Sequence, residues 1–170
     1  IAKVLGSSTA VDTVRFPRTT LANRTGDCDD TTVLLASLLE AAGIRTMVLT
    51  TPGHIFLAFD SDGGAENAAL LATRDLEIVS AGGTAWIPVE TTVLKEGFMA
   101  AWKAASSLVR KHRPTGGLET FAFRDMSTAF PSMPLKPSSI TVAEPAPAAV
   151  SERFDASVAR LDTEVYLVRL

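Results

Sequence analysis

Cysteine is almost absent from this chain, whose 170 residues include a single one, Cys28. One cysteine excludes an internal disulfide, and it also excludes a structural zinc site built from several cysteines. It leaves room for a catalytic thiol, and such a thiol works in a reducing or an oxidising compartment.

Long apolar runs and strong charge are missing as well. No stretch of about 18 apolar residues occurs, so the sequence predicts no membrane span. The net charge is −3 and there is no long basic run, so nucleic acid is not an expected partner. A chain of 170 residues is long enough for one globular domain with an extension. It begins with Ile1 rather than Met, so the lack of a signal peptide decides nothing about its compartment.

The single cysteine stands where the strongest helical pattern of the chain begins. Residues 28–42 carry a broad apolar face, and Gly43 supplies a C-terminal stop. The N-terminus of a helix favours a thiolate over a thiol. Asp27, Asp29 and Asp30 suit the same helix end, but they raise the pKa of a thiol if they point at it. Successive helical residues turn by about 100°, so we expect Asp29 and Asp30 to project away from the sulfur.

An imidazole and a carboxylate follow further along the chain. His54 opens a predicted strand that runs to Phe59, and Glu90 closes a predicted strand over 85–89. If these strands pair antiparallel, the start of the first lies opposite the end of the second. The two-residue period of a strand then places His54 and Glu90 on one face. A thiol, an imidazole and a carboxylate in this order are the parts of a nucleophilic triad.

Helical and extended patterns are mixed along the chain, which indicates an α+β fold. We expect the helix that begins at Cys28 to pack over the sheet face that carries His54. Residues 61–64 are expected to break the strand that His54 opens. The other expected elements are one or two helical turns within 17–23, strands over 44–50 and 76–79, turns at 51–53 and 81–83, and a helix over 95–112.

Three blocks of the sequence together resemble a known family. They are Gly26-Asp27-Cys28-Asp29-Asp30, Pro52-Gly53-His54 and Trp86-Ile87-Pro88-Val89-Glu90-Thr91-Thr92. Their residues and order are similar to those of the transglutaminase-like superfamily, particularly its bacterial protease-like branch, over about residues 15–105. The resemblance implies a papain-like core, in which a Cys-bearing helix packs on an antiparallel sheet whose neighbouring strands carry the His and an acid. The acid of the family is usually Asp, whereas this chain has Glu90.

The resemblance also implies a reaction, which is acyl transfer on an amide or peptide through a Cys28 thioester. His54 would move the proton, and Glu90 would orient the imidazole. Peptidase or amidase hydrolysis is preferred over cross-linking, with a protein or peptide as substrate, no cofactor and no metal. The family branch suggests a periplasmic or secreted location. The alternative is a catalytically inactive protein-interaction or structural module with the same fold.

Two further residues are candidates for the substrate cleft. The backbone N–H of Cys28 is a natural oxyanion donor, and Asn23 is the one nearby side chain that we name as a possible second donor. Trp86 is expected in the core, with a wall of the cleft as its alternative position, because its strand parity matches that of Glu90.

The expected organisation has three parts. Residues 1–113 form the transglutaminase-like core, 114–149 an irregular Pro-rich linker and 150–170 a C-terminal helix. That helix either docks on its own domain or serves a protein partner or an oligomer, and both alternatives stay open. The acidic run over 60–63 is expected to be a solvated turn rather than a calcium loop.

Overall fold

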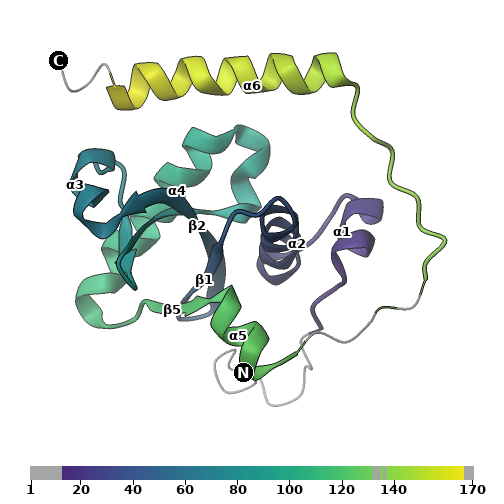
Figure 1. Cartoon of the computed structure of the whole chain (residues 1–170), viewed down its shortest axis with the longest axis horizontal. Coiled ribbons are helices and arrows are strands. Elements are labelled where there is room, and N and C mark those ends of the chain that lie inside the picture. The colour runs from purple at the N-terminus through teal and green to yellow at the C-terminus, as the bar shows by residue number, and fades with distance from the viewer. Residues whose placement is uncertain (1–12, 132–134, 136, 167–170) are drawn as a thin grey trace.

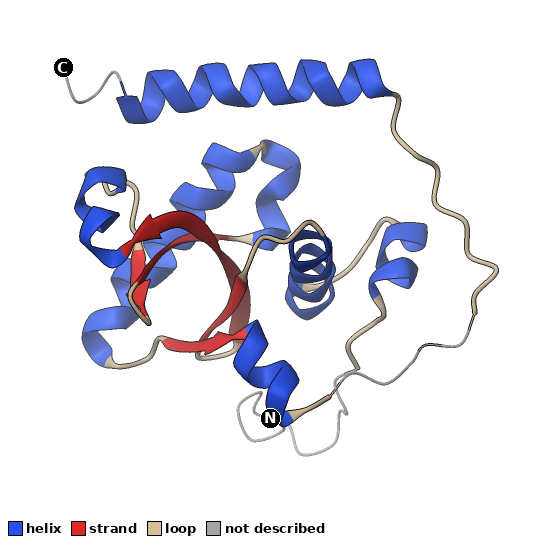
Figure 2. Cartoon of the chain, viewed as in Figure 1, coloured by secondary structure: helices blue, strands red, loops and turns tan. Residues whose placement is uncertain are grey.

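The chain folds around a curled, antiparallel sheet of five strands in the order β3-β4-β2-β1-β5, flanked by helices (Figures 1 and 2). The structure, a computed structural model, describes residues 13–131, 135 and 137–166. The first twelve residues of the expected core, residues 132–134 and 136 of the expected linker, and the last four residues of the expected terminal helix lie outside them. The strands are β1 Thr46–Thr51, β2 His54–Gly64, β3 Val79–Ala81, β4 Thr84–Val89 and β5 Glu119–Ala122.

The described helices confirm the α+β class. They are α1 Pro17–Asn23, α2 Cys28–Ala41, α3 Ala68–Leu71, α4 Phe98–His112, α5 Phe123–Ala129 and α6 Pro147–Leu161. Short helical turns follow several of these elements: η1 Ala65–Asn67, η2 Thr91–Glu96, η3 Arg113–Thr115 and η4 Asp162–Tyr166. None of the helices in the described part of the chain is long and apolar enough to cross a membrane.

The β1–β2 hairpin and the pairing of β2 with β4 determine where His54 and Glu90 lie. The hairpin turns at Gly53, whose φ is 74°, and pairs Thr51 with His54. β2 pairs antiparallel with β4, with Ala58 opposite Pro88. Residues directly opposite each other share a face, so the predicted pairing and parity are confirmed.

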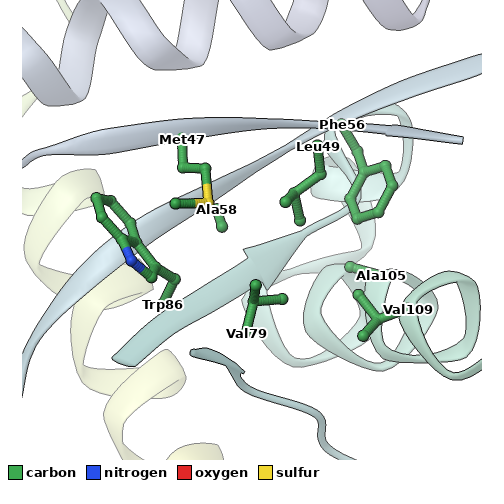
Figure 3. Packing of buried hydrophobic residues seen from close by; sticks show 8 residues of the cluster. All are labelled: Met47, Leu49, Phe56, Ala58, Val79, Trp86, Ala105 and Val109. Atoms are coloured by element: carbon green, nitrogen blue, oxygen red, sulfur yellow. The ribbon is translucent and has the colours of Figure 1, made fainter. Parts of the chain in front are cut away.

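The inner face of the curl holds the main hydrophobic core (Figure 3). Residues of four neighbouring strands, β1 to β4, point into it, because successive strand side chains take opposite faces. Two residues of α4 close this core at one side. Its members are Met47, Leu49, Phe56, Ala58, Val79, Trp86, Ala105 and Val109. The face that begins with His54 is therefore filled by the sheet's own side chains and by α4.

The helix α2 packs on the opposite, outer face of the curl, beside β1 and β2 (Figure 2). Both the N–H and the hydroxyl of Thr46 donate to Glu40 of α2, at 2.6 and 2.7 Å. Thr46 pairs with Phe59 and so shares its face, not that of His54. Our expectation that α2 covers the His54 face is wrong, because strand parity does not reveal the curl that encloses this face.

The expected linker also contains a strand and a helix. β5 pairs antiparallel with β1, with Phe121 opposite Val48, and α5 follows it directly. Residues 119–122 therefore extend the sheet, and residues 123–129 form a helix instead of an irregular linker. Similarly, β2 does not end at 61 but continues to Gly64, with a register shift after Asp60.

A second buried cluster joins α4 and the C-terminal segment to the outer side of β4. It contains Trp102, as expected, and also Leu76 and Ile78, which precede the short β3 instead of lying in it. Val165 completes the cluster, and Leu161 packs against it. The expected terminal helix begins at Pro147 rather than at 150, and its C-terminal end packs on its own domain.

Candidate functional site

The first turn of α2 is capped so that Cys28 is its first residue. Asp27 has extended dihedral angles, and its Oδ1 accepts the backbone N–H of Asp30 at 3.2 Å. This is the usual way in which an Asp side chain satisfies one of the first amides of a helix. The amide of Cys28 belongs to the same first turn, whose N–H groups have no acceptor within the helix.

Asp30 anchors this turn to the preceding segment. Its side chain is 2% exposed, accepts the backbone N–H of Arg15 at 2.7 Å and pairs with Nη1 of Arg15 at 3.3 Å. Asp30 therefore projects away from the sulfur, as the helical rotation predicts. Asp29 does not, because Sγ of Cys28 donates to its Oδ1 at 3.6 Å.

The thiol of Cys28 is half-buried, and its surroundings act on its pKa in opposite directions. Burial raises the pKa of Cys28 above its ordinary value, and the negative charges of Asp29 and Asp27 raise it further. Hydrogen bonding from the backbone of Ile55 lowers the same pKa. The net direction is upward, so the resting thiol holds its proton.

The imidazole and the carboxylate lie together, as the parity of their strands predicts. Nε2 of His54 is 2.6 Å from Oε2 of Glu90, and the two side chains are 28% and 6% exposed. The imidazole is stacked on Phe56, with ring centroids 6.0 Å apart and planes inclined by 17°. A carboxylate at Nε2 selects the tautomer with the proton on that nitrogen, which leaves Nδ1 as the basic atom.

Thr92 holds the second oxygen of Glu90, and our reading of the sequence missed it. Its backbone N–H and its hydroxyl donate to Oε1 at 3.0 and 2.7 Å, and Glu90 thereby caps η2. The signal in the sequence is a carboxylate followed two residues later by threonine, a local side chain-to-backbone capping pattern. The carboxylate thus binds the ring with one oxygen and its own chain with the other.

The sulfur of Cys28 lies beside the residue that follows His54, at one end of β2. The backbone of Ile55, the residue after His54, bonds the sulfur of Cys28. The ladder between β2 and β4 runs from Gly64 to Leu57, so Ile55 lies beyond its end. The outer helix α2 consequently reaches the site at the end of the sheet rather than across its face.

Trp86 and Asn23 do not join this group. Trp86 is 5% exposed within the main core, where its Nε1 donates to the carbonyl of Ala81 at 3.1 Å. It pairs with Asp60, six residues along β2 from His54, which corresponds to about 20 Å. The position of Trp86 as a cleft wall beside the triad is therefore wrong. Asn23 ends α1 with an exposed side chain, and no described hydrogen bond joins it to Cys28.

Trp86 instead lines a separate cavity of about 370 Å³ between the β3–β4 hairpin and β5. The guanidinium of Arg45 lies over its indole ring at 5.7 Å, while bonding Asp60. Within the described residues, no group of three His, Cys, Asp or Glu side chains is placed to hold a metal ion. Residues 60–63 belong to β2 rather than to the solvated turn that we expected there.

Comparison of the chain with protein-family models, with curated proteins and with solved structures finds no match.

Proposed function

We propose that this chain is a thiol-dependent acyl-transfer enzyme of the transglutaminase-like superfamily, with a papain-like core, that hydrolyses amide or peptide bonds. The observation that carries the proposal is the 2.6 Å contact between His54 and Glu90, at the same end of β2 where Ile55 bonds the sulfur of Cys28. These two contacts support an arrangement in which nucleophile, base and orienting acid work together.

The chemistry follows from these three groups. Nδ1 of His54 removes the thiol proton while Sγ attacks the substrate carbonyl carbon, and the carbonyl electrons move to its oxygen. The N–H of Cys28 faces the developing oxyanion. When the oxyanion collapses, the carbon–nitrogen bond breaks and His54 protonates the leaving amine. Water, deprotonated by His54, then attacks the thioester, and the acid and the free thiol are released.

Glu90 orients the imidazole and balances its charge when it holds the extra proton. Its side chain is longer than the usual Asp of the family, and Thr92 compensates for this freedom by fixing Oε1. A carboxylate held at both oxygens loses little entropy when it receives the ring, which supports Glu90 as a competent third residue.

General-base activation fits the thiol better than a preformed thiolate does. The raised pKa of Cys28 keeps its proton in place until His54 takes it during attack. Water is the simplest acyl acceptor at such a site, and the family resemblance favours hydrolysis over transfer to an amine.

A non-catalytic binding module is the second candidate, and one observation favours it. The Sγ proton of Cys28 is directed at Asp29, and both burial and this carboxylate raise the thiol pKa. A thiol held in this way is a poor nucleophile unless the imidazole overcomes it.

Acylation by 4-nitrophenyl acetate separates the two candidates. The enzyme predicts a burst of about one 4-nitrophenolate per chain and a covalent acetyl group on Cys28, because a thioester intermediate forms faster than water removes it. We expect His54→Ala to slow the burst by about 10²–10⁴-fold, the usual contribution of a general base. Cys28→Ser should remove the burst.

Glu90→Gln tests the third residue, with Glu152→Gln on the exposed surface of α6 as its matched control. We expect the first change to slow acylation by at least about tenfold and the second to leave it unaltered. A folded wild-type protein that releases 4-nitrophenolate no faster than Cys28→Ser would exclude the enzyme and favour the binding module.

A further inference from the structure

Three threonine hydroxyls connect the beginning of α2 with the residue that follows Glu90. Oγ1 of Thr91 lies 2.9 Å from Oγ1 of Thr31 and 3.1 Å from Oγ1 of Thr32. Thr91 is 4% exposed and Thr32 is fully buried. Buried hydroxyl groups that bond one another across two elements fix the spacing of those elements, because an unpaired buried hydroxyl is costly.

The donor and the acceptor in each hydrogen bond of this cluster follow from the contacts of Thr31. Thr31 donates to the carbonyl of Asp27 at 2.7 Å, and its oxygen also lies 3.3 Å from the carbonyl of Cys28. Its single proton is then committed, so it accepts from Thr91. Thr91 in turn accepts from Thr32. The chain of bonds therefore runs from Thr32 through Thr91 and Thr31 to the peptide group that immediately precedes Cys28.

The other described anchors of α2 do not connect it to the acid. Asp30 ties the first turn to Arg15, on the N-terminal side of the chain. Glu40 ties the last turn to Thr46 of β1. Thr91, by contrast, is bonded in sequence to Glu90, whose carboxylate holds His54. Its hydroxyl joins the turn that carries the nucleophile to the residue next to the orienting carboxylate.

We propose that Thr91 is a positioning residue for acyl transfer, whose hydroxyl sets the sulfur of Cys28 at attack distance from the His54–Glu90 pair. The inference rests on the proposed function and adds a residue to it. No proton of the reaction passes through Thr91. It acts through geometry, since a misplacement of about 1 Å at a reacting centre costs about 100-fold in rate.

The pH profile of Cys28 alkylation by iodoacetamide tests this role, because Cys28 is the only thiol in the chain. Thr91→Val removes the hydroxyl and keeps the shape, whereas Thr91→Ser keeps the hydroxyl. Thr46→Val is the matched control, because Thr46 is 1% exposed and its hydroxyl binds α2 at the end remote from Cys28. Urea unfolding of each variant shows that the fold is retained, and His54→Ala is measured in parallel.

We expect Thr91→Val to move the alkylation midpoint toward that of His54→Ala, with about tenfold slower labelling at neutral pH. Thr91→Ser should restore the wild-type midpoint, and Thr46→Val should lower stability without moving it. If His54→Ala shifts the midpoint and folded Thr91→Val does not, the positioning role is overturned while the proposed function stands. If His54→Ala itself leaves the midpoint in place, both are overturned.

Discussion

At the residue scale, the groups around the sulfur of Cys28 act on the pKa of its thiol in opposite directions. Burial and the neighbouring Asp29 favour the protonated thiol, while the Ile55 backbone favours the thiolate. The first two prevail in the resting protein. In the mechanism that we propose, His54 supplies the base for attack, and its contact with Glu90 orients the ring.

Asp29→Asn removes the negative charge beside the sulfur and should lower the pKa of Cys28. We expect alkylation by iodoacetamide to begin at lower pH and to be faster at neutral pH than in wild type. The measurement is the labelling rate across pH by intact mass. Asp125→Asn, on exposed α5, is the control and should leave the profile in place. A profile of Asp29→Asn at higher pH than wild type would show that Asp29 does not restrain the thiol.

The raised pKa of Cys28 also makes the stability of the folded protein depend on pH. The folded-state pKa of Cys28 lies above its unfolded value, so its contribution to folding is fully present below the unfolded pKa. The contribution is lost as pH rises through the folded pKa. The free energy of unfolding should consequently fall less on the alkaline side in Asp29→Asn than in wild type.

The sequence predicted which residues come together better than how each is held. Strand parity was enough to bring His54 to Glu90, because it depends only on the period of two. The contact of Asp29 with the sulfur depends on a side-chain rotamer, which helical periodicity leaves free. The bonds of Thr91 join residues about sixty positions apart, and no local pattern marks them.

At the scale of elements, the loop before α2 is the tightest part of the site. A Cβ on Gly26 would lie 2.6 Å from Cβ of Asp30 and 3.0 Å from Cγ2 of Thr20. Glycine at this position lets α1, the loop and the first turn of α2 approach one another. The placement of Cys28 therefore depends on Gly26, a residue without a side chain.

Gly26→Ala should lower the free energy of unfolding by about 1–3 kcal/mol, the usual cost of overpacking, because Asp30 must move. It should also slow the 4-nitrophenyl acetate burst, since the first turn of α2 shifts with Asp30. Urea unfolding and burst kinetics measure the two effects. Thr25→Ala, in the same loop and exposed, should change neither. A variant with the unfolding free energy and the burst rate of wild type would show that the loop accommodates a Cβ at position 26 without strain.

Element prediction succeeded where apolar periodicity was strong and failed where it was weak. The patterns over α2, β1, β2 and β4 gave their positions within a few residues. β5 was missed because three of its four side chains are exposed, so it lacks an alternating pattern, and because prolines surround it. The face on which α2 packs was predicted wrongly, since parity assigns residues to faces but does not say which face the sheet curls around.

At the scale of the whole molecule, the C-terminal segment is attached by its end. Leu161 and Val165 pack on the second core cluster, beside Trp102. Earlier in α6, Val150, Phe154 and Val158 form an exposed apolar row (Figure 1 shows α6 lying along one side of the molecule). From the sequence, this segment was expected either to dock on its own domain or to bind a partner. The structure shows that its C-terminal end docks on its own domain.

Val165→Ala should lower the free energy of unfolding by about 1–3 kcal/mol, because it removes two buried methyl groups from a packed cluster. Val150→Ala, half exposed on the same segment, should change it by less than about 0.5 kcal/mol. Urea unfolding followed by tryptophan fluorescence gives both values. Equal effects of the two changes would mean that the end of the chain does not belong to the core.

The pH dependence of Cys28 alkylation in wild type and in His54→Ala tests the central claim most directly. The claim is that imidazole and thiol act as one unit, and the single cysteine makes the labelling unambiguous. We predict that loss of the imidazole moves the alkylation midpoint upward by at least about one pH unit in a protein that remains folded. Superimposable profiles would contradict the claim and remove His54 from the site.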